Sequence, residues 1–123
     1  MKKDQPNVVI YFTDDQGYGD LSCMGAKDFS TPVLDRMANE GIRFTDWYSN
    51  SPVCSPSRAS LLSGKYPSRA GVRSILRGHR TATGLPPSTK TIASVLKSNG
   101  YQTAITGKWH LGHTPSLLPS SRG

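Results

Sequence analysis

The apolar run NVVIYFT, at residues 7–13, ends directly in two aspartates and a glycine-rich loop, DDQGYGD. The run is short and rich in β-branched and aromatic residues, which predicts a buried β-strand rather than a helix. In open sheets of parallel strands, ligands bind beyond the carboxyl ends of the strands. The run therefore favours a sheet domain whose edge carries polar, ligand-binding side chains.

Further along the chain, short apolar runs alternate with amphipathic stretches that begin at Thr or Pro and end at Gly. Proline suits the first position of a helix, and glycine suits the residue that ends it. The predicted strands are 7–13, 42–48 and 101–106, and the predicted helices are 32–41, 56–64 and 91–100. This alternation predicts an α/β fold with a mostly parallel central sheet flanked by helices.

Several local expectations follow from the same patterns. Thr31 and Ser55 are expected to cap the first two helices, because their hydroxyls suit that position. The apolar side chains of the third helix, Ile92, Val95 and Leu96, are expected to face inward. Residues 65–90, rich in Arg, Gly, Pro and Thr, read as an extended surface loop, and no element is predicted for the tail after His113.

Length and composition exclude several protein classes. The 123 residues suffice for one modest domain, and two cysteines are too few for a disulfide framework. There is no run of about 18 apolar residues, so no membrane span is predicted. The first residues, MKKDQPN, lack the apolar stretch of a signal peptide, so either the protein is not exported or the chain begins after its leader.

The formal net charge of +7 is unevenly distributed. Up to Asp46 there are five Lys or Arg residues and eight acidic residues; from Trp47 onward there are ten Lys or Arg residues and no acid. A solvated basic face, a nucleic-acid surface and attraction for a small anionic substrate all fit this pattern. No recognised nucleic-acid-binding module is present, so nucleic acid is not predicted as a partner.

Cys54 lies just before the predicted start of a helix, ahead of its expected cap Ser55, and Arg58 follows four residues later. Backbone amides at a helix start favour an anion, and a guanidinium one turn into the helix can lean back toward the same point. A thiol, a helix start and a guanidinium together predict a site for phosphate or sulfate. The alternative is a structural, buried cysteine. The cysteine phosphatases are excluded, because their loop separates Cys and Arg by more than the three residues found here.

Two further polar clusters follow predicted strands. Asp14 and Asp15 follow the first, where they are either a solvated turn or ligands for a hard cation such as Ca²⁺ or Mg²⁺. Lys108 and His110 follow the last, where alternate residues of a strand would share a face. An ammonium there can neutralise a substrate oxygen, and an imidazole can transfer a proton. The remaining histidines, His79 and His113, are expected on the surface.

These clusters, in this order, resemble the type I sulfatases of the alkaline phosphatase superfamily. The segment CSPSRASLLSGKYPSR is similar to the family's first signature, C-x-P-S-R with an apolar stretch and Ser-Gly-Lys, and GYQTAITGKWHLG is similar to its second. NVVIYFTDDQGYGDL resembles the opening strand with its metal-binding aspartates, and STPVLDRMANEGIRFTDWYS the helix and strand that follow. The resemblance implies that residues 7–123, after an extension over 1–6, are the N-terminal portion of a sulfatase domain whose sheet is incomplete in this chain.

The resemblance also implies how Cys54 would act. A maturation enzyme would read C-x-P-x-R and convert the cysteine to formylglycine, an aldehyde that becomes a hydrate. One hydroxyl of the hydrate would attack the sulfur of a sulfate ester and displace the alcohol. The second hydroxyl would collapse back to the aldehyde and release sulfate.

Roles for the other candidates follow from the same resemblance. Arg58 would fix the hydrate and support the metal site, Lys108 would bind sulfate, and His110 would hydrogen-bond the formylglycine hydroxyl. Asp14, Asp15 and the modified Cys54 would be ligands of Ca²⁺, with Mg²⁺ or another divalent cation as the alternative. The substrate would be a sulfated small molecule or glycan.

The family's remaining metal ligands, with a further histidine and lysine, come from sequence beyond this chain. The isolated chain is therefore expected to be inactive and not to hold Ca²⁺ tightly. Alternatives are a phosphonate or phosphodiester hydrolase of the same superfamily and a non-catalytic anion-binding module with an unmodified Cys54. The basic stretch from Arg69 to Arg80 is either a solvated loop or a contact for a sulfated glycan. Family members are usually periplasmic, secreted or lysosomal, but this sequence does not predict a compartment.

Overall fold

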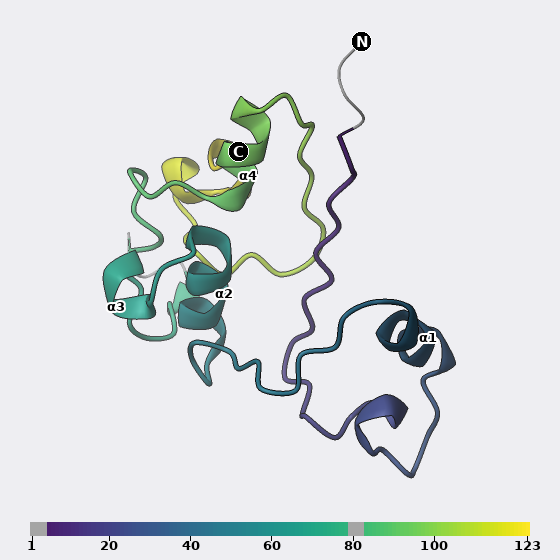
Figure 1. The fold of residues 1–123 in the computed structure, drawn as a ribbon. Helices are drawn as coiled ribbons and strands as arrows, with labels where there is room; N and C mark the ends of the chain where they lie inside the picture. Colours follow the sequence, from purple (N-terminus) through teal and green to yellow (C-terminus); the bar gives the residue numbers. More distant parts are fainter. Residues whose placement is uncertain (1–4, 79–82) are drawn as a thin grey trace. The chain divides into compact units, whose positions relative to one another are not determined.

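Most of the helices begin at a proline or are followed by a glycine. The computed structural model describes residues 5–78 and 83–123, and Figure 1 shows helices joined by long stretches of coil. The α-helices are α1 (Pro32–Glu40), α2 (Cys54–Ser63), α3 (Pro67–Ala70) and α4 (Ile92–Ser98), and the 3₁₀ helices include η1 (Ser22–Met24), η3 (Pro115–Leu117) and η4 (Pro119–Ser121). The chain divides into two units, Met1–Trp47 and Tyr48–Gly123.

In the first unit, helix α1 confirms the predicted boundaries. It begins at Pro32, and its C-cap is Gly41, whose amide donates to the Met37 oxygen at 3.0 Å. Thr31 precedes the helix, but its hydroxyl makes no cap bond to the amides of α1. The hydroxyl instead donates to the carboxylate of Asp35 at 2.9 Å and accepts from the Ser22 amide at 3.0 Å. The predicted helix is correct, and the predicted capping bond is wrong.

Asp35 connects η1 to α1. Its Oδ1 accepts from the Cys23 amide at 2.9 Å in addition to the Thr31 hydroxyl. Desolvation raises the pKa of Asp35, but the hydrogen bonds from Thr31, Cys23 and Ser22 together outweigh it and hold the pKa below its usual value. The ionised carboxylate is thus the form that this contact requires.

In the second unit, α2 begins earlier than predicted. Its first residue is Cys54, two positions before the expected start at Pro56, and Val53 is the N-cap. Proline is tolerated at Pro56 because amides of the first helical turn have no partner within the helix. Ser55 therefore lies inside the helix and does not cap it. The predicted end is confirmed: Gly64 has a φ of 66° and donates to the Ser60 oxygen at 2.8 Å.

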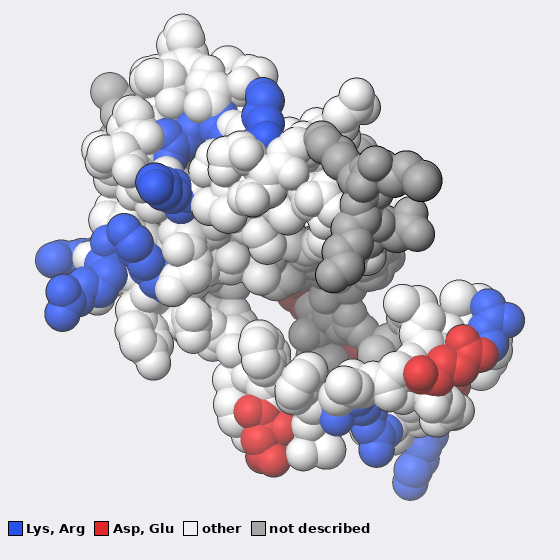
Figure 2. Space-filling model, turned by 45° about the horizontal axis from the view of Figure 1, so that its top comes forward, with Lys and Arg blue, Asp and Glu red and all other residues white. Residues whose placement is uncertain are grey.

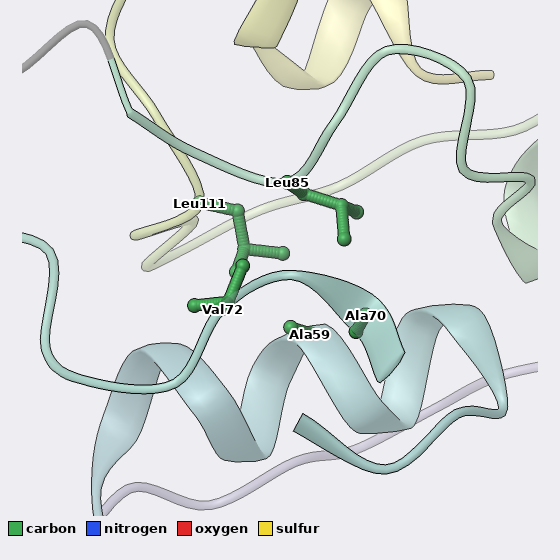
Figure 3. Packing of buried hydrophobic residues seen from close by; sticks show 5 residues of the cluster. All are labelled: Ala59, Ala70, Val72, Leu85 and Leu111. Atoms are coloured by element: carbon green, nitrogen blue, oxygen red, sulfur yellow. The ribbon is translucent and has the colours of Figure 1, made fainter. Parts of the chain in front are cut away.

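A small apolar core lies against α2 (Figure 3). Each of its five members is at most 1% exposed: Ala59 of α2, Ala70 of α3, and Val72, Leu85 and Leu111 from coil. The Leu85 amide donates to the Leu111 oxygen at 2.9 Å, so the two coil segments are also joined through their main chains. The unit is built around one helix and the coil that folds over it.

The core corrects the prediction that residues 65–90 form an extended surface loop. In the described part of that range, Pro67–Ala70 is a helix, and Ala70, Val72 and Leu85 are buried. Single apolar residues among Gly, Pro and Arg produce no periodic pattern, so no pattern in this stretch indicates burial. Residues 79–82, including His79 and Arg80, lie outside the described residues.

The capping of α4 agrees with its sequence. The Thr91 hydroxyl accepts from the Ser94 amide at 3.1 Å, and the Ser94 hydroxyl accepts from the Thr91 amide at 2.9 Å, a reciprocal capping box. The predicted inward face is present only in part, because Leu96 is half-buried but Ile92 and Val95 are 37% and 47% exposed.

The tail also differs from its prediction. Residues after His113 form η3 and η4, where no element was expected. Leu117 is only 5% exposed, and its carbonyl accepts from the Trp109 indole at 2.8 Å. Prolines at the first position begin both short helices, which is the only local signal the sequence carried.

The predicted sheet is not present in residues 5–78 and 83–123, none of which is in a β-strand. The three expected strands lie in coil, and their apolar side chains are open to solvent: Val9 is 88%, Tyr11 82% and Ile42 84% exposed. A strand forms only where a neighbour accepts and donates its main-chain hydrogen bonds. An apolar run predicts the preference for a sheet but does not supply that neighbour.

A separate expectation concerns membranes. No helix within the described residues has the length and apolar character needed to cross one.

Candidate active site

Cys54 is the first residue of α2 and carries a free, half-buried thiol. The prediction placed it just before the helix, whereas the structure places it in the first turn. Amides of this turn have no partners within the helix, and the dipole of the ten-residue helix is positive here. The expected anion-favouring setting of Cys54 is therefore retained, although Cys54 is now the first residue of the helix, two positions before its predicted start.

Arg58 joins α2 to the segment GKWHLG. It is 9% exposed, and its Nη1 donates to the main-chain oxygen of Lys108 at 2.6 Å. Arg58 lies four residues after Cys54, so both side chains fall on the same side of α2. The structure thus brings two of the three predicted clusters together, and a buried guanidinium is the connecting group.

His110 is fixed by a coil residue that the sequence did not single out. Its Nε2 lies 2.8 Å from the main-chain oxygen of Leu76. Its Nδ1 is buried and has no hydrogen-bond partner within the described part of the chain. His110 also has a φ of 56°, a left-handed conformation that is uncommon for residues other than glycine. Its ring is held in one orientation by a specific contact.

The argument that Lys108 and His110 share the face of a strand is not supported. The segment is not a strand, and positive φ angles at Gly107 (97°) and His110 (56°) turn the chain. Alternation applies only to an extended backbone. Lys108 is exposed and His110 half-buried, so the two side chains have different surroundings.

Asp14 and Asp15 belong to the first unit, whereas the other candidates belong to the second. Both aspartates are exposed, and Asp15 has a φ of 58°, which Asp adopts in turns more readily than most residues. In residues 5–78 and 83–123, no three His, Cys, Asp or Glu side chains gather closely enough to hold a metal ion. Two carboxylates are also fewer than the six to eight oxygens that Ca²⁺ takes. These residues alone therefore do not form a complete calcium site.

His113, which was expected on the surface, is exposed. Cys23, the other cysteine of the chain, is a half-buried free thiol. The main chain of Cys23 is engaged on both sides, by the Asp35 carboxylate and by the guanidinium of Arg43 at 2.5 Å.

Two residues support the site in a way that the sequence did not indicate: Ser55, which was expected to be a helix cap, and Leu76. Ser55 is fully buried, and its hydroxyl accepts from the Leu76 amide at 3.1 Å. Leu76 is partly buried and packs against the apolar core. A serine before a proline suggests a helix cap, so no sequence signal separated a buried acceptor from an ordinary cap.

A cavity of about 370 Å³ lies elsewhere in the second unit, between α4, residues 87–90 and residues 121–123. It contains none of the predicted site residues. Arg122, which lines it, donates to the oxygens of Pro86 and Thr89, each at 2.8 Å. Desolvation lowers the pKa of Arg122.

Taken together, the second unit presents a thiol at the start of α2, a buried guanidinium one turn further along the same helix, and an imidazole fixed by Leu76, whose amide bonds to the residue after Cys54. This arrangement suits a tetrahedral oxyanion near Cys54, because a helix start and a guanidinium both favour negative charge.

A model of the sulfatase family matches residues 6–116 of the chain. The chain is 48% identical over 123 residues to arylsulfatase G of Mus musculus, which covers 97% of this chain and 22% of that protein. It is 46% identical over 120 residues to arylsulfatase A of Homo sapiens, covering 96% of this chain and 24% of that protein. The chain thus spans about a quarter of the length of these relatives.

The fold is also similar to a solved structure, Ps i-CgsB in complex with k-i-k-neocarrahexaose. The TM-score is 0.85 at 41% sequence identity, and the match covers 89% of this chain and 24% of that one.

Proposed function

Because this chain belongs to the sulfatase family, we propose that the protein containing it hydrolyses sulfate esters. One observation of the structure supports the proposal most directly. The hydrogen bond from Arg58 to the Lys108 oxygen joins the two segments that carry the family's signatures, although they lie 50 residues apart. Residues 7–123 would be the N-terminal portion of the catalytic domain.

In this proposal Cys54 is the residue that becomes formylglycine. Its thiol is free and belongs to a C-x-P-S-R sequence, as a maturation enzyme that acts on this motif requires. The hydrated aldehyde supplies a nucleophilic hydroxyl and a second hydroxyl for the release of sulfate. The positive end of α2 would favour the negative charge that gathers around this position.

Arg58, Lys108 and His110 would act on the groups around position 54. The hydrogen bond from Arg58 to the Lys108 oxygen restricts the position of the guanidinium, so its positive charge would stay beside the first turn of α2. Lys108, which is exposed, would bind a sulfate oxygen through its ammonium. His110 would hydrogen-bond a hydroxyl at position 54 and receive or return its proton.

Asp14 and Asp15 would be two ligands of a divalent cation, Ca²⁺ in the first instance and Mg²⁺ otherwise, with the modified Cys54 as a third. Carboxylates are suitable donors for both ions. The further oxygens that such a site needs would come from parts of the protein outside this chain. The cation would polarise the sulfate group.

The three apolar coil segments at 7–13, 42–48 and 101–106 would pair into the central sheet of an alkaline phosphatase-like fold. Their exposed side chains support this, since Val9, Tyr11 and Ile42 otherwise face solvent. The likeness to a solved structure four times as long is consistent with a sheet completed by other parts of the protein.

The substrate would be a sulfated small molecule or a sulfated glycan. The second unit contains no acidic residue, and Arg69, Arg73 and Arg77 are exposed. Figure 2 shows lysine and arginine side chains reaching into solvent on the face that it draws. An unopposed positive charge attracts polyanions and raises their rate of association. The relative Ps i-CgsB, solved with an oligosaccharide, supports a glycan as the first class to test.

The proposal is tested on the full-length protein made in its own host. Mass spectrometry of the peptide that spans Cys54 is expected to show an aldehyde in place of the thiol. Turnover of an aryl sulfate is expected to exceed that of an aryl phosphate diester. The opposite preference would indicate a phosphodiester hydrolase, and an unmodified cysteine with no turnover would indicate a non-catalytic anion-binding protein.

A further inference from the structure

The main chain of Leu76 is held from both sides by residues of the candidate site. Its amide donates to Ser55 Oγ at 3.1 Å, and its carbonyl lies 2.8 Å from Nε2 of His110. Ser55 is fully buried and follows Cys54 directly in α2. Ser55 therefore follows the candidate nucleophile, Cys54, in the chain. It is also connected through the main chain of Leu76 to His110, the candidate proton-transfer residue.

The partner of His110 determines where its ring carries hydrogen. A carbonyl oxygen only accepts, so Nε2 must carry a hydrogen and donate it to Leu76. Nδ1 is buried without a hydrogen-bond partner in the described part of the chain, and a buried, unmatched N–H is costly. Of the two neutral tautomers, the one with its hydrogen on Nε2 is therefore favoured, and its lone pair on Nδ1 can accept a hydrogen bond.

We infer that Ser55 is a positioning residue for His110, acting through the main chain of Leu76. This inference rests on the proposed function, in which His110 bonds to a hydroxyl at position 54. The Ser55 hydroxyl holds the main chain of Leu76 beside the first turn of α2. The Leu76 carbonyl then fixes the tautomer and the orientation of the His110 ring. Such indirect support keeps reacting groups in register, and small displacements of them reduce rates strongly.

The alternative role for Ser55 is purely structural. Loss of its hydroxyl would leave the Leu76 amide without its acceptor and lower the stability, whatever His110 does. A structural role does not affect the tautomer of His110, nor does it make the effect of Ser55 depend on the presence of His110. These two properties separate the alternatives.

The kinetic test compares Ser55→Ala with Ser60→Ala in the full-length protein. Ser60 is a matched control, because it is a buried serine of the same helix whose hydroxyl has no partner in the described part of the chain. Rates are divided by the fraction of formylglycine, measured by mass spectrometry, since both changes lie near the modified residue. Ser55→Ala is expected to lower kcat roughly 10- to 100-fold with little change in KM. Ser60→Ala is expected to resemble the parent.

Two variants test whether the effect passes through His110. Ser55→Thr retains the hydroxyl and is expected to recover most of kcat. In a His110→Ala background, Ser55→Ala is expected to change the residual rate by no more than about twofold, because coupled residues are not additive. Equal effects of Ser55→Ala with and without His110 would contradict the inference.

A spectroscopic measurement does not depend on activity. With ¹⁵N-labelled histidine, His110 of the parent is expected to carry its hydrogen on Nε2, and Ser55→Ala is expected to give a mixture of tautomers. Hydrogen on Nδ1 in the parent would overturn the inference even if the protein is an active sulfatase. The parent protein could also be inactive while its His110 shows the expected tautomer and loses it in Ser55→Ala. That result would refute the proposed function but support the positioning of His110 by Ser55.

Discussion

Arg58 donates from Nη1 to the main-chain oxygen of Lys108 at 2.6 Å, and this bond joins α2 to the segment GKWHLG across 50 residues. Arg58 is almost fully buried, whereas Lys108 is exposed. A charged donor on a main-chain acceptor is among the stronger single hydrogen bonds in proteins. The stability of the second unit should therefore depend on this guanidinium.

Replacing Arg58 with methionine is expected to lower the free energy of unfolding by about 1–3 kcal/mol. Methionine has a similar length but no donor, so the Lys108 oxygen loses its partner. Arg69→Met is the control, because Arg69 is exposed on α3 and should change stability by less than about 0.5 kcal/mol. Urea unfolding of the two variants measures the difference. Equal destabilisation would show that the Arg58 bond contributes little.

Gly84 lies where a methyl group cannot fit. A Cβ at this position would approach the main-chain oxygen of Leu111 and lie 2.8 Å from a methyl of Leu117. The main-chain oxygen cannot move away, because it accepts from the Leu85 amide. Gly84→Ala is expected to destabilise the second unit by about 1–3 kcal/mol, the usual cost of overpacking.

The control for this change is Gly19→Ala. No atom lies within 4 Å of a Cβ at Gly19, so its stability should change by less than about 0.5 kcal/mol. Thermal unfolding of both variants decides the point. A Gly84→Ala protein that unfolds at the parent temperature would show that residues 84 and 111 separate at little cost.

Local sequence signals predicted helices α1, α2 and α4 but not α3 or the short helices of the tail. Pro32 and Gly41 bound α1, and Gly64 ends α2, because these positions depend on the conformations that proline and glycine allow. The pairing of Cys54 and Arg58 near one helix start also followed from local spacing. These features need no information from distant residues.

Features that depend on distant residues were not predicted. The buried side chains of Val72 and Leu85 have no periodic neighbours, and the role of Ser55 is set by Leu76, 21 residues away. The predicted sheet is not present in residues 5–78 and 83–123 for the same reason, since a strand requires partners that local sequence does not supply. The apolar run at 7–13 indicates a preference for a β-strand but does not indicate which segment would pair with it.

Cys54→Ser tests the chemistry of position 54 and rests on the proposed function. A serine hydroxyl can attack the sulfur of an aryl sulfate and release the phenol, but it has no second hydroxyl with which to expel sulfate. The variant is expected to lose turnover and to accumulate protein that carries one sulfate on Ser at position 54. Intact-protein mass spectrometry after incubation with substrate measures this product. Sustained turnover by the variant would contradict the role of Cys54.

The contact between η1 and α1 should depend on pH through Asp35. Hydrogen bonds hold the folded pKa of Asp35 below its usual value, so the stabilisation is fully present above about pH 4 and is lost as the pH falls through the lower, folded pKa. The Cys23 amide, which donates to Asp35 at 2.9 Å, reports this protonation in NMR spectra. Its chemical shift is expected to titrate with a midpoint below the usual aspartate value. In Asp35→Asn, which does not titrate, that transition should be absent.

Calcium binding by the 123-residue chain is the last test. Asp14 and Asp15 offer two carboxylates, and no larger group of ligands gathers in the described parts of the chain. Ca²⁺ takes six to eight oxygens, so two side chains leave most of its coordination to water and hold it weakly. Calorimetric titration is expected to give an affinity weaker than micromolar for this chain. For the full-length protein, Asp14→Asn and Asp15→Asn are each expected to weaken calcium binding, since each change removes a charged ligand. Sub-micromolar affinity in the 123-residue chain would mean that the two aspartates recruit further ligands from within it, and the division of the metal site proposed above would be wrong.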